Sequence, residues 1–174
     1  MTRLECGCPS DYPDWDGQDV NLGGWLVHEM RAPMFLHMPI GFEACLHRQH
    51  QDIERLGLTP RWPGFVLSRS AMFRGAILCP LAEERSAARH VRRLPNPFRL
   101  RARIIHGDVG QIQADVKRMQ SELLDAGCMP RELYLAYLTC PVCEEKRGGK
   151  RIMILRRWVP SEKLKKKLAA RSES

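Results

Sequence analysis

The sequence lacks any apolar run that approaches the ~20 residues needed to span a bilayer, and its N-terminal region lacks the apolar segment of a signal peptide. We therefore expect a soluble, cytoplasmic protein with no membrane partner. It also contains no H-E-x-x-H motif and no Ser-His-Asp pattern, so no standard hydrolytic signature is present. Without a helix-turn-helix pattern, or aromatic residues interleaved with its basic ones, it does not predict nucleic-acid binding.

The missing secretory signal also bears on the seven cysteines, because disulfide frameworks belong to secreted proteins. We expect free thiols instead, some of them metal ligands. The chain has 174 residues, enough for one domain or two small ones with a proper core, and 44% of them are hydrophobic.

The net charge of +8 is concentrated at one end of the chain. Residues 144–174 carry eleven Lys or Arg and four Glu, a net of +7. We predict an acidic irregular arm over residues 1–32, whose acidity would complement the basic final strand, and a basic tail over residues 160–174. Trp15 and Trp25 are expected to hold the arm to the body. The tail is predicted to be a frayed helix or disordered, with a solubilising role or an acidic partner.

The clearest architectural signal is a strand-helix-strand pattern over residues 98–141. Residues 98–106 alternate apolar and basic side chains, as a half-buried strand does. Gly107 ends this strand, Asp108 is a suitable helix N-cap, and apolar residues then recur at helical spacing as far as Gly127. Strands are predicted over residues 133–138 and 150–159, which completes a β-α-β-β unit.

An earlier stretch repeats this pattern. It has a short apolar run at residues 34–38, a helix over residues 42–56, and two short strands at 65–68 and 73–78. Residues 80–94 read as a polar helix that joins the two copies. The predicted fold class is α+β, with a tandem β-α-β-β repeat, pseudo-two-fold symmetry, and an antiparallel sheet with its helices on one face. The predicted body spans residues 33–159, divided into repeat one (33–79), a helical linker (80–97) and repeat two (98–159).

Two such units, with IIHGDVGQI at residues 104–112 and ELYLAYLTCP at residues 132–141, resemble the GyrI-like family, also called the SOUL/GyrI or effector-binding superfamily. The resemblance implies a small-molecule pocket between two halves, and members that bind planar ligands, hydrolyse small molecules or inhibit gyrase. Drug-binding members carry a buried Glu on a late strand. Here that strand has Arg156 and Arg157 and no acid, which favours an anionic ligand.

The pocket is expected to be lined by aromatic walls for a planar ligand and by one cation. The predicted ligand-binding residues are Tyr134, Tyr137, Trp158 and Arg156.

The cysteines offer the most specific chemistry. Cys6 and Cys8 form a C-x-C pair and Cys140 and Cys143 form a C-x₂-C pair, so that together they would complete a tetrahedral zinc site. Such a site would join the arm to the last hairpin. Unligated thiols, a redox-active pair and an iron–sulfur site are the alternatives.

A second constellation lies on the first predicted helix. Glu43, His47, His50 and Glu54 share one helical face and are the alternative metal ligands, although a solvated polar face with i,i+4 pairing is the simpler explanation. His37 and His106 end the first strands of the two copies and are the candidate catalytic residues.

Two functions follow from these residues. The first is a small-molecule-binding protein of GyrI-like fold with a structural zinc site, whose ligand is planar and apolar, or anionic. The alternative is a metal- or His-dependent hydrolase that acts on a small molecule in the same cleft. A protein partner that docks through the acidic arm or the basic tail is a third possibility.

Overall fold

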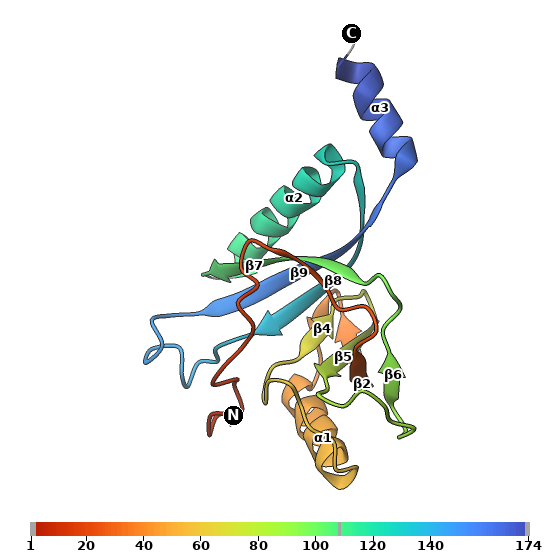
Figure 1. Ribbon diagram of the computed structural model, residues 1–174. Helices are drawn as coiled ribbons and strands as arrows, with labels where there is room; N and C mark the ends of the chain where they lie inside the picture. The colour runs from red at the N-terminus through yellow and green to blue at the C-terminus, as the bar shows by residue number, and fades with distance from the viewer. Residues whose placement is uncertain (1–2, 108, 173–174) are drawn as a thin grey trace.

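The structure is a computed structural model that describes residues 3–107 and 109–172, and its core is one antiparallel sheet (Figure 1). The strands are β1 (Asp19–Asn21), β2 (Leu26–Phe35), β3 (Met38–Pro39), β4 (Leu67–Arg69), β5 (Arg74–Pro80), β6 (Val91–Arg93), β7 (Arg99–His106), β8 (Cys128–Tyr137) and β9 (Arg151–Pro160). The helices are α1 (Phe42–Arg55), α2 (Val109–Asp125) and α3 (Glu162–Ser172). The predicted mixture of helices and antiparallel strands is therefore confirmed. The predicted N-cap, Asp108, lies outside the described residues.

Eight of the nine strands follow the order β1-β7-β9-β8-β4-β5-β2-β3, and β6 pairs with the N-terminal end of β2. The longest pairing joins β8 to β9 over eight residue pairs, followed by β7 with β9 and β2 with β5 at seven pairs each. Along β9, apolar residues alternate between the two faces of the sheet. The centre of the sheet is joined by β4 and β8 through only two residue pairs, Ser68 with Leu135 and Arg69 with Tyr134. This short pairing connects the β2–β5 part of the sheet to the β7–β9 part.

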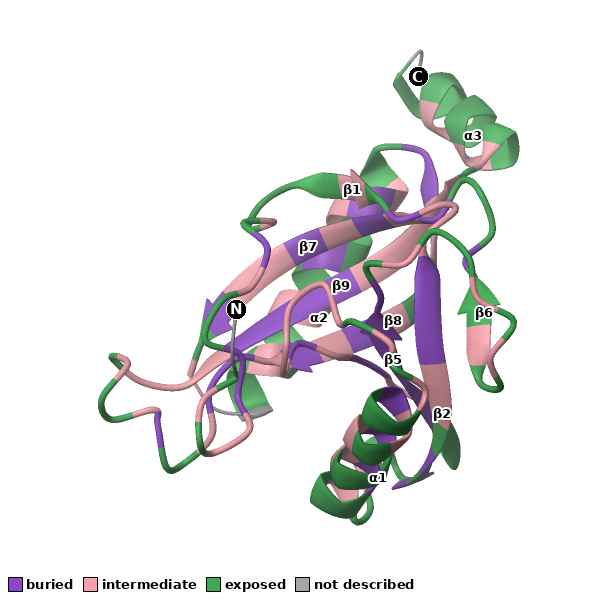
Figure 2. Ribbon diagram, turned by 60° about the horizontal axis from the view of Figure 1, so that its bottom comes forward, coloured by how far each residue is buried: buried purple, intermediate pink, exposed green. Residues whose placement is uncertain are grey.

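Helices α1 and α2 cover the same face of the sheet. Ile77 of β5 packs beneath α1 with Cys45, and Ile154 of β9 packs beneath α2 with Met119. The strand register connects Ile77 to Ile154 through Ser68 and Leu135, which face each other across successive strands. Both helices are amphipathic, so they bury one stripe and expose the other (Figure 2).

The opposite face of the sheet is covered by the N-terminal arm, which crosses β7, β9 and β8 in Figure 1. Leu22 is 1% exposed and belongs to the main core cluster. Trp15 packs against Trp25, Trp62 and Phe65, with ring centroids 5.5–6.3 Å apart. The expectation that Trp15 and Trp25 hold the arm to the body is confirmed.

The acidic residues of the arm bind β7 and not the final strand as expected. Asp19 accepts two hydrogen bonds of 2.8 Å from Arg101, and Asp16 accepts one of 2.7 Å from the backbone N–H of Ile104. Asp19 also raises the pKa of Arg101, because the carboxylate stabilises the charged guanidinium. The arm is thus paired with the edge of the sheet through β1.

Two secondary-structure expectations differ from the structure, and a third, for the tail, agrees with its helical alternative. The strand expected at residues 34–38 begins at Leu26, within the predicted arm, and ends at Phe35. Residues 80–97 do not form a helical linker: β5 continues to Pro80 and β6 pairs with β2. Backbone hydrogen bonding to β2 and burial of Leu94 outweigh the helical composition of this segment. Most of the basic tail forms α3, which has no buried residue.

The burial of the arm leads to a stability prediction. Leu22→Ala should lower the free energy of unfolding by about 2–5 kcal/mol, because a fully buried side chain is lost and a cavity remains. The same exchange at Leu36, which is 56% exposed, should change it by less than about 0.5 kcal/mol. Urea denaturation of both variants measures this. Equal, small effects would show that the arm is not part of the folded core.

Candidate functional site

Four cysteine thiols meet where the start of the arm approaches the loop between β8 and β9. The Sγ atoms of Cys6, Cys8, Cys140 and Cys143 all lie within 4.8 Å of one another. Cys8 and Cys143 are buried, whereas Cys6 and Cys140 are partly exposed. The structure therefore brings together the four residues that the sequence nominated as metal ligands.

Each pair is shaped by a tight turn. Gly7 lies between the first two cysteines with φ of 87°, and its N–H donates to the carbonyl of Leu4 at 2.8 Å. In the second turn, the N–H groups of Cys143 and Glu144 donate to the carbonyl of Cys140 at 3.0 and 2.9 Å. These turns direct both thiols of each pair towards the other pair.

Contacts outside the thiols hold the two turns in place. Nη1 of Arg147 donates to the carbonyl of Pro9 at 3.0 Å and to the carbonyl of Leu138 at 2.9 Å, which links the arm to the end of β8. Gly64 packs so closely that an added Cβ would lie 2.8 Å from the carbonyl oxygen of Gly7. Hydrogen bonds and close backbone packing therefore fix the positions of the two cysteine-bearing turns.

The spacing of the sulfurs fits a shared metal and not a disulfide. The Sγ atoms of Cys140 and Cys143 are 3.9 Å apart, far beyond a disulfide bond of about 2.05 Å. Four thiolates on one Zn²⁺, at about 2.3 Å each, would lie about 3.8 Å from one another. Among the residues that the structure describes, these four cysteines are the group of metal-binding side chains that gathers at such distances.

The environment of the thiols acts on their pKa values in opposite directions. Burial raises the pKa of Cys8, and hydrogen bonding to Cys140 and Cys143 raises it further. Burial also opposes ionisation of Cys140, but the backbone N–H groups of Cys143 and Val142 and the thiols of Cys8 and Cys6 outweigh it. The pKa of Cys140 falls to about 7. Of Cys8 and Cys140, it is therefore Cys140 that ionises more readily.

The alternative metal ligands are not brought together in this way. Glu43, His47 and Glu54 are exposed on the outer side of α1, and His50 forms an i,i+4 pair with Glu54 at 2.9 Å. Such pairing is typical of a solvated helix face. The four residues are not among the described groups with metal-binding geometry.

The two candidate catalytic histidines lie far apart in the sheet. His37 follows β2 and His106 ends β7, and four strands separate β2 from β7, a distance of roughly 24 Å at the usual strand spacing. The strand order therefore does not bring the two candidate histidines into one site.

His37 has a partner that the sequence did not suggest. Its Nδ1 lies 3.0 Å from Oγ of Ser70, which is in the turn between β4 and β5. His37 and the preceding Leu36 have positive φ angles of 67° and 47°, an uncommon conformation for residues other than glycine. The tight turn between β2 and β3 directs the imidazole to Ser70, a contact between two loops that no local sequence pattern announces.

The predicted ligand-binding residues do not share one surface. Tyr134 is 2% exposed and packs on Phe98 beneath the arm, and its burial raises its pKa to about 12. Tyr137 and Trp158 lie on the α2 side, but Tyr137 faces Ile152 and Trp158 faces Pro130, at opposite ends of the β8–β9 pairing.

Arg156 lies two residues from Trp158 on the same strand, and burial lowers its pKa. Its Nε and the indole Nε1 of Trp158 are buried without a hydrogen-bond partner among the described residues. Among the four predicted ligand-binding residues, Arg156 and Trp158 are thus the two with an unpartnered N–H donor, and both donors lie on the same side of the sheet.

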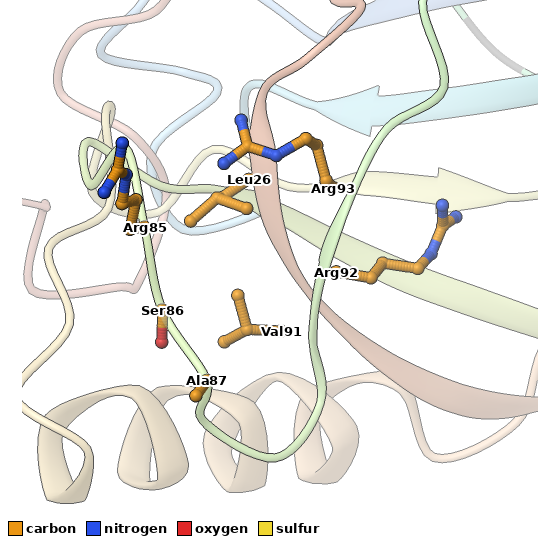
Figure 3. A pocket seen from close by; sticks show the side chains of 7 residues that line it. All are labelled: Leu26, Arg85, Ser86, Ala87, Val91, Arg92 and Arg93. Atoms are coloured by element: carbon orange, nitrogen blue, oxygen red, sulfur yellow. The ribbon is translucent and has the colours of Figure 1, made fainter.

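A hollow of about 570 Å³ lies elsewhere, beside β6. It is lined by Leu26, Val91, residues 85–87 and two further arginines (Figure 3). Arg93 donates to the carbonyls of Gly24 and Glu84, and Arg92 extends away from Leu26 to pair with Glu29. Both arginines are engaged in holding β6 against the body, so the hollow is not a prepared binding site.

A buried polar network under α1 was also not expected from the sequence. His28 is 0% exposed; its Nε2 lies 2.8 Å from Oδ2 of Asp52 and its Nδ1 lies 3.4 Å from the amide nitrogen of Gln49. That amide also donates to the carbonyls of His28 and Ile77, both at 3.0 Å. Both ring nitrogens are therefore occupied, and the network fastens α1 to β2 and β5.

Among the described helices, none combines the length and the apolar character that crossing a bilayer requires.

In comparisons with known proteins, a family model described as "Bacterial hydrolase" matches residues 2–158. Neither the curated proteins nor the solved structures gave a significant match.

The His28–Asp52 contact leads to a pH prediction. Hydrogen bonds from Arg55 and then from His28 lower the pKa of Asp52, although burial opposes them. A lowered pKa stabilises the folded state above the unfolded pKa of about 4, and this contribution is lost as the pH falls through the folded value. Asp52→Asn should therefore be less stable than the parent at pH 7.

The difference in free energy of unfolding should shrink below pH 4, as measured by urea denaturation across the pH range. Glu43→Gln, on the exposed face of the same helix, is the matched control and should follow the parent at every pH. A stability gap that stays constant down to pH 2 would contradict the assignment.

Proposed function

Since the chain belongs to the bacterial hydrolase family, we propose that it is a hydrolase of small ester substrates with a structural zinc site formed by Cys6, Cys8, Cys140 and Cys143. The clustering of four thiols from two distant segments is what supports the zinc site. Four thiolates fill a tetrahedral coordination shell and leave no open position for water or substrate. The metal would thus stabilise the fold, and hydrolysis would depend on other side chains.

For the fold, we propose the GyrI-like arrangement of two halves related by a pseudo-two-fold axis between β4 and β8. The strand order supports it. In β2-α1-β4-β5 and in β7-α2-β8-β9, the last strand of the unit lies between the other two. The halves then meet through β4 and β8, and each helix lies on the same face of the sheet.

The hydrolytic proposal rests on one observation, the 3.0 Å contact between Nδ1 of His37 and Oγ of Ser70. A serine hydroxyl within hydrogen-bond reach of an imidazole is the arrangement of a nucleophile and its general base. With the proton of the imidazole on Nε2, Nδ1 accepts the hydrogen bond from Oγ. His37 is one of the two candidate catalytic residues that the sequence suggested. Ser70 supplies the nucleophile that the sequence analysis had not identified.

The proposed reaction has two steps, acylation of Ser70 and hydrolysis of the acyl-enzyme. Oγ of Ser70 attacks the ester carbonyl carbon while Nδ1 of His37 takes its proton, and the C–O bond to the alcohol then breaks as the imidazolium returns the proton to the leaving oxygen. Water next attacks the acyl-Ser70 carbonyl, again losing a proton to Nδ1. The bond to Oγ breaks, Oγ regains the proton, and the carboxylic acid leaves.

A non-enzymatic ligand-binding role is the second candidate. The aromatic contact between Phe42 of α1 and Tyr137 of β8, with ring centroids 5.4 Å apart, favours it because the contact bridges the two parts of the sheet. A planar ligand that separated these rings would stack between them.

The zinc proposal predicts a metal that depends on the cysteines. Protein purified without a His tag should contain about one zinc per chain by elemental analysis, and Cys140→Ser/Cys143→Ser should contain none and melt at a lower temperature. Cys128→Ala removes a thiol outside the cluster and should keep the zinc. Zinc that persists in the double variant, or iron in its place, would contradict the proposal.

The hydrolytic proposal predicts that substitution of His37, but not of His106, lowers the esterase activity. Ser70→Ala and His37→Asn should each lower kcat for p-nitrophenyl acetate by at least about 100-fold, since nucleophile and base act in one step. His106→Asn, the matched histidine control, should retain the activity. Undiminished turnover in Ser70→Ala, or loss of activity in His106→Asn, would exclude this assignment and leave ligand binding as the better account.

A further inference from the structure

Apolar side chains gather on the surface at two neighbouring turns. Seven large hydrophobic residues are exposed among the described residues, and six of them belong to the β2–β3 and β4–β5 turns. Their exposed fractions range from 47% for Met72 to 65% for Phe73. These six residues, which we name the apolar tip, are Phe35, Leu36, Met38, Ile40, Met72 and Phe73.

The two turns form one surface because they are bonded to each other. The backbone N–H of Met34 donates to the carbonyl of Phe73 at 3.0 Å, and His37 contacts Ser70. Within the first turn, Phe35 lies opposite Met38 in the β2–β3 pairing. Contiguous apolar patches on monomeric proteins are usually functional, so this one requires an explanation.

Three arginines and one carboxylate lie next to the apolar tip in the sequence. Residues 31–43 and 66–76 contain Arg31, Arg69 and Arg74 against the single acidic residue Glu43, so the net charge is positive. Arg31 and Arg69 both face Ala76 from adjacent strands, and Arg74 faces Pro33 one step further towards the turn. The three arginines therefore follow one face of the sheet up to the apolar tip.

This combination suits a lipid surface better than another protein chain. The strand at this edge, β3, has two residues and one of them is Pro39, which has no N–H to offer to an added strand. The exposed side chains sit in and next to the turns of two hairpins. In an anionic membrane the acyl chains lie beneath the phosphate groups. Apolar residues at the tip would meet the acyl chains, and the neighbouring arginines would meet the phosphates.

We propose that the apolar tip docks the protein on the surface of an anionic lipid bilayer. The six side chains enter the interface and Arg31, Arg69 and Arg74 contact lipid phosphates. The sequence predicted no membrane partner, because the signal is spread over two short turns and no long apolar run exists. Docking would also hold Ser70 and His37 at the level of the membrane, but it does not depend on hydrolysis by them.

Vesicle co-sedimentation tests this surface directly. The protein should bind vesicles of phosphatidylcholine with about a third phosphatidylglycerol, and bind pure phosphatidylcholine vesicles at least about tenfold more weakly. Phe35→Ser/Phe73→Ser should weaken binding to the anionic vesicles by at least about tenfold. Arg31→Gln/Arg74→Gln should also weaken it, whereas Lys117→Gln/Arg118→Gln, which removes two exposed charges on α2, should not.

Three results would overturn the proposal. The first is binding that survives Phe35→Ser/Phe73→Ser and is lost when Lys165, Lys166 and Lys167 of α3 are changed to Gln, which would assign it to the tail. The second is a parent protein that does not bind anionic vesicles. The third is a dimer that Phe35→Ser/Phe73→Ser dissociates, which would assign the apolar tip to self-association. Ser70→Ala should bind vesicles like the parent, so failure of the hydrolytic proposal and failure of membrane docking are distinguishable.

Discussion

The fold depends on burying both faces of one sheet. Strands β5 and β9 are apolar on both sides, and helices α1 and α2 cover only one of them. The N-terminal arm covers the other with Leu22, Trp15 and Trp25, although little of it is regular secondary structure. An irregular segment gains little from its own hydrogen bonds, so it needs anchors at its ends. Strand β1 is one anchor, and the four-cysteine cluster is the other.

This arrangement separates stability from chemistry. The cysteine cluster lies at the loop between β8 and β9, whereas the Ser70–His37 contact lies at the turns that follow β2 and β4. A closed set of thiolates suits a metal that fixes two segments, and a hydroxyl beside an imidazole suits acyl transfer. The buried His28–Asp52–Gln49 network has no free ring nitrogen and contributes by fastening α1 to the sheet.

The sequence predicted the parts whose signals are local. The periodicity of residues 98–106 and the stripe of α2 were sufficient for β7 and its helix, and the C-x-C and C-x₂-C pairs were sufficient to nominate the four thiols. The sequence did not predict the features that depend on which strands and hairpins lie next to one another. Residues 80–97 have helical composition, but β6 within them pairs with β2. Ser70 meets His37 only because two hairpins are neighbours. Tyr137 and Trp158 share adjacent strands, yet antiparallel register separates them.

The central claim is that one metal bound by four thiolates fixes the arm over the sheet. X-ray absorption at the zinc edge of the purified protein tests it most directly, because it reports the ligand atoms themselves. The account predicts a single shell of four sulfur atoms at about 2.3 Å. A shell containing nitrogen or oxygen at about 2.0–2.1 Å would place the metal on histidines or carboxylates and contradict the account.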